Sequence, residues 1–173
     1  MPVSVDEVDR FLDRFADWAH TQPDVMAVAL VGSHARNTAT ETSDVDLVVI
    51  TCQSDRYVRN QGWIRRFGPI DQQRIEDYGK VTSIRVWYTD GREVEYGITG
   101  ESWAALPLDE DTRRVLSDGM RVLFERGPIL SRHQLDLPDQ GVLPTRFRPR
   151  LASRLSVTRR QTPVLDAPDG GGS

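Results

Sequence analysis

The chain has 173 residues, a formal net charge of −4 and 38% hydrophobic residues, a size at which one domain can bury a substantial core. No stretch approaches the roughly 20 apolar residues of a membrane span. The acidic N-terminus is unlike a secretory signal peptide, so we expect a cytoplasmic protein that meets no membrane. One cysteine excludes an internal disulfide, and three scattered histidines provide no zinc-ligand spacing. Any bound metal would therefore be held by carboxylates.

Charge divides the chain at about residue 130. Residues 131–173 contain seven arginines and four aspartates, a net charge of +3, so residues 1–130 carry −7. Prolines interrupt this basic segment repeatedly and it ends in Asp-Gly-Gly-Gly-Ser, a composition that predicts a mostly disordered tail. We therefore assign one folded domain to residues 1–130. Because that domain is acidic, it is poorly suited to clamp a phosphate backbone, and we do not expect nucleic acid as a partner.

The first part of the domain predicts a helix, two strands and a short helical stretch between the strands. In residues 4–20, apolar side chains recur at helical spacing after a Ser-x-x-Glu capping box. Residues 25–31 form a continuous apolar run, which is typical of a central strand buried on both faces. A short helical stretch at 34–37 and a polar loop at 38–43 then lead to a second strand at 44–51.

The second part of the domain predicts two more helices and three more strands. We expect a weakly patterned helix at 55–67, then strands at 81–88 and 93–99 joined as a hairpin by Thr-Asp-Gly-Arg. A helix at 109–117 and a last strand at 120–125 complete the domain. This order predicts an α/β fold in which helices pack on a mixed sheet of about five strands.

The residues that point to chemistry lie where the first two strands meet. Gly32 and Ser33 follow the first apolar run, and Asp44 and Asp46 open the second strand. Residues two apart on a strand face the same side, so the two carboxylates project together, with Cα atoms roughly 6.5 Å apart. That arrangement suits two hard cations roughly 3.5–4 Å apart, as in displacement at phosphorus. Gly32 allows close backbone approach and Ser33 offers a hydroxyl and an amide, so this turn would hold a triphosphate while the carboxylates hold Mg²⁺.

A third carboxylate would complete such a site and draw the proton from an attacking hydroxyl. Glu95 is the better candidate, because it lies on an otherwise apolar strand where an unpaired charge is costly. Glu93 points to the same face of that strand and stays open as the alternative. Two roles are open for Arg36: contact with the triphosphate, or an exposed ion pair with Glu41. We expect His34 to be a solvent-facing residue of the turn.

At these residues the chain resembles the DNA polymerase β-like nucleotidyltransferase superfamily, whose signature is Gly-Ser, a spacer, and Asp-x-Asp on the next strand. Residues 31–50 are most similar to small bacterial members. These are the aminoglycoside and lincosamide nucleotidyltransferases and the minimal nucleotidyltransferases that act as antitoxins beside HEPN-domain toxins. Asn37 stands where the family often has glycine, and asparagine tolerates the left-handed backbone that such a turn requires.

The resemblance implies an enzyme that uses two Mg²⁺ ions to transfer a nucleoside monophosphate, AMP from ATP or its equivalent from another nucleoside triphosphate, to a hydroxyl, releasing pyrophosphate. By position, Gly32 and Ser33 would bind the triphosphate, and Asp44, Asp46 and Glu95 would form the metal site. The acceptor would be a small molecule or a partner protein. A partner would supply the surface that the small-molecule enzymes keep in a helical C-terminal domain. The alternative is a non-catalytic, antitoxin-like module that binds a nucleotide or a partner, and polymerisation of nucleic acid is a weaker one.

Overall fold

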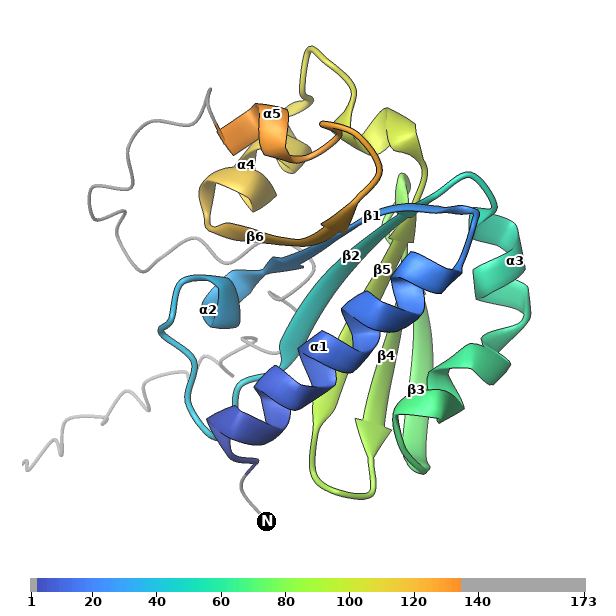
Figure 1. Ribbon diagram of the computed structural model, residues 1–173, viewed down its shortest axis with the longest axis vertical. Helices are drawn as coiled ribbons and strands as arrows, with labels where there is room; N and C mark the ends of the chain where they lie inside the picture. The colour runs from blue at the N-terminus through green and yellow to red at the C-terminus, as the bar shows by residue number, and fades with distance from the viewer. Residues whose placement is uncertain (1–2, 135–173) are drawn as a thin grey trace, which may run out of the picture.

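The computed structural model describes residues 3–134 (Figure 1). The expectation of a disordered tail therefore falls, apart from its first four residues, outside the described residues. Along the chain the elements are α1 Val5–Thr21, β1 Val25–Val31, α2 Gly32–Ala35, β2 Val45–Thr51, α3 Ser54–Arg59, the 3-10 helix η1 Gln61–Phe67, β3 Ile70–Asp77, β4 Val81–Tyr88, β5 Glu93–Thr99, the 3-10 helix η2 Glu101–Ala104, α4 Glu110–Ser117, β6 Met120–Glu125 and α5 Ser131–Gln134. None of the described helices is both long and apolar enough to cross a bilayer.

The described residues form one six-stranded sheet in the order β3-β4-β5-β2-β1-β6. Strand β2 runs parallel to β5, whereas the other neighbouring strands are antiparallel, and β4 and β5 form the expected hairpin. The mixed sheet with its helices confirms the α/β fold. It has one strand more than the sequence predicted.

The additional strand is β3, which pairs with β4 at the edge of the sheet. Its residues Ile70–Asp77 are exposed or half-buried, so its sequence carries no alternation of apolar and polar side chains. Hydrophobic periodicity reports burial on one face, and an edge strand without a buried face lacks that signal. The helix expected at 55–67 is divided at Asn60, whose side chain accepts a hydrogen bond from Gly62 N at 3.2 Å.

Helix α1 covers one face of the sheet, as Figure 1 shows. It begins with the predicted capping box, in which Ser4 N donates to Glu7 Oε2 at 2.9 Å and Glu7 N donates to Ser4 Oγ at 3.3 Å. Its fully buried Phe15 lies in a cluster of aromatic rings from α1, η1 and β5. The neighbouring rings, with centroids 5.0 to 6.3 Å from that of Phe15, belong to Phe11, Trp18, Trp63, Phe67 and Tyr96. This packing holds β5 against α1 and η1, because Tyr96 of β5 lies in the cluster.

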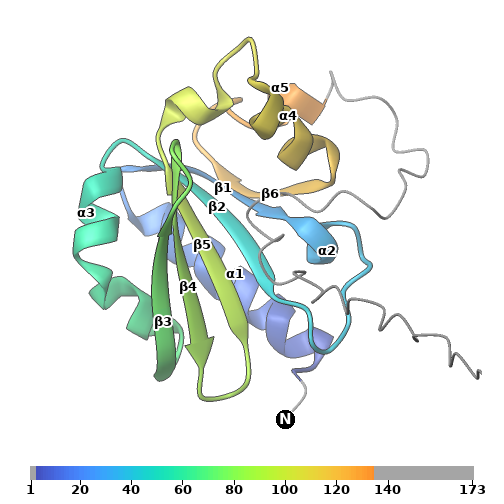
Figure 2. The same ribbon diagram turned by 180° about the vertical axis from the view of Figure 1, so that it is seen from behind.

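The other face of the sheet carries α4, α5 and η2, which pack beside β1, β2 and β6 (Figure 2). Trp103, Leu116 and Leu130 are buried in this second core. In α5, the Arg132 side chain donates to the backbone oxygen of Ala104 at 2.8 Å. The folded part therefore extends at least to α5, beyond the boundary expected at residue 130.

Candidate active site

The antiparallel pairing of β1 with β2 brings the Gly-Ser turn to the second carboxylate. Val31, the last residue of β1, lies opposite Asp46. Gly32 follows with φ of +73°, and a Cβ built on it would lie 2.5 Å from Asp46 Oδ2. Glycine is therefore required here for two reasons: an L side chain is disfavoured at this φ, and it has no space against the carboxylate. The turn and the Asp-x-Asp segment form one packed unit.

The parallel pairing of β2 with β5 adds the third carboxylate. Glu95 lies opposite Asp46 in this register. Oxygen atoms of Asp44, Asp46 and Glu95 all lie within 4.8 Å of one another, and the three residues are buried. Carboxylate oxygens are the ligands that Mg²⁺ prefers, so the donor set fits the predicted metal. The structure thus brings together the three acids that the sequence singled out, and Glu93 lies beside them without joining this group.

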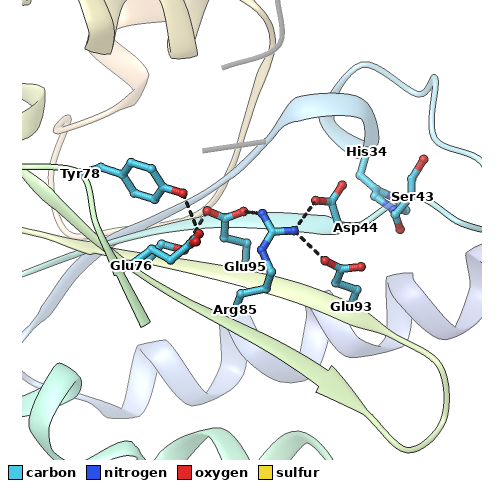
Figure 3. A network of polar contacts seen from close by, with 9 residues as sticks. His34, Ser43, Asp44, Glu76, Tyr78, Arg85, Glu93 and Glu95 are labelled. Carbon is cyan, nitrogen blue, oxygen red and sulfur yellow. Dashed lines mark hydrogen bonds and ion pairs between the residues drawn. The ribbon is translucent and has the colours of Figure 1, made fainter. Parts of the chain in front are cut away.

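Two residues of β4 that the sequence analysis did not single out contact these acids, and Figure 3 shows one of them, Arg85. Arg85 is 3% exposed and forms ion pairs with Glu95, with Glu93 at 2.6 Å and with Asp44 at 3.5 Å. Ser83 Oγ donates to Glu95 Oε1 at 2.7 Å. The signal was present in the strand pattern at 81–88, since both polar residues face one side of a buried strand. A buried arginine there requires acidic neighbours.

Burial and ion pairing set the protonation of this cluster. Burial raises the pKa of the Glu95 carboxyl to about 7, although Arg85 and Ser83 act in the opposite direction. Burial lowers the pKa of the Arg85 guanidinium, but attraction by Glu95, Glu93 and Asp44 outweighs it and raises that pKa. Arg85 therefore stays charged, whereas the Glu95 carboxyl holds a proton more readily than an exposed glutamate does. A group of that kind can accept a proton from a reacting hydroxyl.

Arg36 connects the Gly-Ser turn to the distant turn before β6. Its Nη1 donates to the backbone oxygen of Asp118 at 2.9 Å and forms an ion pair with the Asp118 carboxylate. The partner of Arg36 is thus Asp118, so the second of its two open roles, an exposed ion pair with Glu41, is wrong. Gly119 leaves room for this side chain, because a Cβ there would lie 2.6 Å from Arg36 Cγ. Contact of Arg36 with a triphosphate stays a prediction.

The turn also contacts the segment that leads into β2. His34 is half-buried, with Nε2 3.4 Å from the backbone oxygen of Ser43, and burial lowers its pKa. The expectation of a solvent-facing histidine is therefore wrong. The backbone oxygen of Ser33 accepts a hydrogen bond from Thr38 N at 3.0 Å. Asn37 has φ of +56°, which confirms the left-handed turn residue expected from the sequence.

A mixed sheet that places a Gly-Ser turn beside Asp-x-Asp and a third carboxylate on the parallel neighbour is the arrangement of the DNA polymerase β-like nucleotidyltransferase superfamily. The sequence model of one family, described as streptomycin adenylyltransferase, matches residues 6–107. That match spans more than half of the chain, and the protein belongs to this family. No match was found among curated proteins.

Several solved structures are similar in fold. An aminoglycoside 6-adenyltransferase from Bacillus subtilis has a TM-score of 0.47 and 15% identity, over 59% of this chain and 37% of that one. The Cid1 poly(U) polymerase has a TM-score of 0.40 and 16% identity, over 56% of this chain and 32% of that one. A Thermotoga maritima CCA-adding enzyme complexed with tRNA has a TM-score of 0.35 and 20% identity, over 56% of this chain and 22% of that one. The chain thus spans between 22% and 37% of these three proteins.

Proposed function

We propose that the protein transfers a nucleoside monophosphate, AMP from ATP, to a hydroxyl of a small molecule or of a partner protein and releases pyrophosphate. The observation that carries this proposal is the convergence of Asp44, Asp46 and Glu95 within 4.8 Å of one another. The Gly32 turn adjoins this cluster, with no room for a side chain against Asp46. A donor nucleotide and its metals need both features at one place.

Each group has a role in this reaction. The turn at Gly32 and Ser33 would hold the triphosphate, and Asp44 and Asp46 would hold Mg²⁺, with two ions expected. When bound, Mg²⁺ would offset the negative charge of the triphosphate and of the departing pyrophosphate. Glu95 would complete the metal site and take the proton from the attacking hydroxyl.

The acceptor is the less defined side of the reaction. The family description names streptomycin, and the similar Bacillus subtilis enzyme is described as an aminoglycoside adenyltransferase. An aminoglycoside is therefore the first small molecule to test, and a partner protein is the second kind of acceptor. Cid1 and the CCA-adding enzyme are described as acting on or binding RNA, so RNA belongs in the same assay. The expectation that nucleic acid is not a partner stays a prediction, as does the cytoplasmic location.

The direct test uses the full chain with Mg²⁺, ATP labelled at the α-phosphate, and a panel of aminoglycosides, proteins and RNA. We expect the label to appear on the acceptor and unlabelled pyrophosphate to be released. The rate of labelling should fall on the order of 100-fold or more in Asp44→Asn and Asp46→Asn. Asp17→Asn is the matched control, because Asp17 is an exposed aspartate of α1. Transfer that survives Asp44→Asn, or no labelled acceptor from any member of the panel, would contradict the proposal.

A second candidate is a non-catalytic module that binds a nucleotide or a partner. The ion pairs of Arg85 with Asp44 and Glu95 favour it, since the carboxylates already have a cation beside them. This alternative predicts that calorimetry detects nucleotide binding while the labelling assay yields no product. Labelled product from any acceptor would exclude it.

A further inference from the structure

Arg85 lies in the middle of the carboxylate cluster. It is on β4, opposite Glu95 of β5 in the sheet register, and it is 3% exposed. Its guanidinium forms ion pairs with two of the three acids of the proposed metal site, Asp44 and Glu95. Figure 3 shows the guanidinium between these acids and Glu93. A buried positive charge is thus already present where a divalent cation would bind.

Glu95 accepts hydrogen bonds at both carboxylate oxygens from β4. Ser83 Oγ donates to Oε1 at 2.7 Å, and Arg85 Nη2 donates to Oε2. A Mg²⁺ ion requires close oxygen ligands in nearly octahedral geometry. The guanidinium takes up a lone-pair site of Glu95 Oε2, and its positive charge repels a second cation. The present contacts of Arg85 and a metal bound through Glu95 therefore exclude each other.

Glu93 is a further partner of the Arg85 guanidinium. It accepts a hydrogen bond from Arg85 Nη1 at 2.6 Å, and its side chain is 22% exposed, against 1% for Glu95. An arginine that releases Asp44 and Glu95 can keep this ion pair and stay compensated. Glu93 is then the acid that retains Arg85, while Glu95 is the acid that changes partner.

We propose that Arg85 is a resident counter-ion of the carboxylate cluster, and that a divalent cation gains Glu95 as a ligand only by displacing its guanidinium. This inference rests on the proposed function, because it assumes a metal site at Asp44, Asp46 and Glu95. It assigns Arg85 a positioning role: it stabilises the metal-free protein and weakens metal binding.

The test is Mn²⁺ affinity of the full chain without nucleotide, measured by electron paramagnetic resonance, together with the melting temperature in EDTA and in excess Mn²⁺. Arg85→Met should bind Mn²⁺ at least 10-fold more tightly than the wild type. Its melting temperature in EDTA should be lower than that of the wild type, and excess Mn²⁺ should raise its melting temperature by more. Arg85→Lys keeps a positive charge and should stay close to the wild-type affinity. An Arg85→Met protein that binds Mn²⁺ no more tightly than the wild type would overturn the inference.

Arg92→Met is the matched control, because Arg92 is 7% exposed and forms an ion pair with Asp90 at 2.7 Å. It should lower the melting temperature without changing Mn²⁺ affinity; an equal gain in affinity there would contradict a specific role of Arg85. Should Arg85→Met fail to fold, the wild type supplies the test. Its Arg85 side-chain Nε–H signal, assigned by its loss in Arg85→Lys, should shift on titration with Mg²⁺, and an unchanged signal at saturation would refute displacement.

The proposed function and this inference fail in different ways. Mn²⁺ binding that is lost in Asp46→Asn establishes the metal site, whatever Arg85→Met then shows. If Asp46→Asn binds Mn²⁺ as the wild type does, the metal site itself is wrong and both ideas fall. If binding is sensitive to Asp46→Asn but unaffected by Arg85→Met, only the role of Arg85 is wrong.

Discussion

Replacing Gly32 with alanine tests whether the turn must lie against Asp46. The residue has φ of +73°, and the new Cβ would lie 2.5 Å from Asp46 Oδ2. The left-handed backbone costs an L residue about 1–2 kcal/mol. Forcing an extra carbon into a filled site typically costs a further 1–3 kcal/mol. We therefore expect Gly32→Ala to lower the free energy of unfolding by about 2–5 kcal/mol and to abolish nucleotide transfer, because the carboxylate must move.

Gly79→Ala separates the two contributions. Gly79 has φ of +78°, and a Cβ built there meets no atom within 4 Å. It should therefore cost only the backbone part, about 1–2 kcal/mol, and leave transfer activity unchanged. Urea unfolding in EDTA, followed by tryptophan fluorescence, gives both values. In an Asp46→Ala background the excess cost of Gly32→Ala should disappear, as the coupling energy of a double-mutant cycle. Equal costs for the two glycine variants, or an excess that persists in that background, would refute the reasoning.

Three further predictions concern the frame around the site. Phe15→Ala should cost about 3–5 kcal/mol of unfolding free energy, because a fully buried ring leaves a cavity under the sheet; a loss below 1 kcal/mol in urea would contradict this packing. Arg36→Met should cost about 1–3 kcal/mol, between the values for exposed and buried ion pairs, since its side chain is 29% exposed and that of Asp118 is 14% exposed. An unchanged melting temperature would show that this ion pair does not stabilise the fold. Asp109 caps α4 by accepting a hydrogen bond from Thr112 N at 2.8 Å, so Asp109→Ala should cost about 1 kcal/mol at pH 7. Bonding to Lys80 and Thr112 lowers the pKa of Asp109 from 3.8 to about 2, so this stabilisation is present above pH 3.8 and lost as the pH falls through about 2. A difference between variant and wild type that is as large at pH 2 as at pH 7 would contradict the assignment.

Burial patterns explain where the sequence was sufficient. Helix α1 was predictable because it buries one face at helical spacing, and the strands β1, β2, β4 and β5 because each is a mostly buried run rich in apolar residues. The edge strand β3 was missed, since a strand exposed along most of its length carries no such apolar pattern. Likewise, the partner of Arg36 lies 82 residues away, and no local pattern identifies Asp118.

The sequence by itself determined the local units: the turn at Gly32, the two aspartates on one face of a strand, and a strand that carries Glu93 and Glu95. Their chemistry was visible because a turn and an Asp-x-Asp strand are set by backbone geometry within about 15 residues. Only the tertiary structure decided which glutamate joins the aspartates, because the parallel register of β2 and β5 places Glu95 opposite Asp46. It also decided that Arg85 contacts Asp44, since that contact depends on the placement of the β4–β5 hairpin beside β2. The register between β2 and β5, which are distant in the chain, is a property of the assembled sheet, and neither strand encodes it alone.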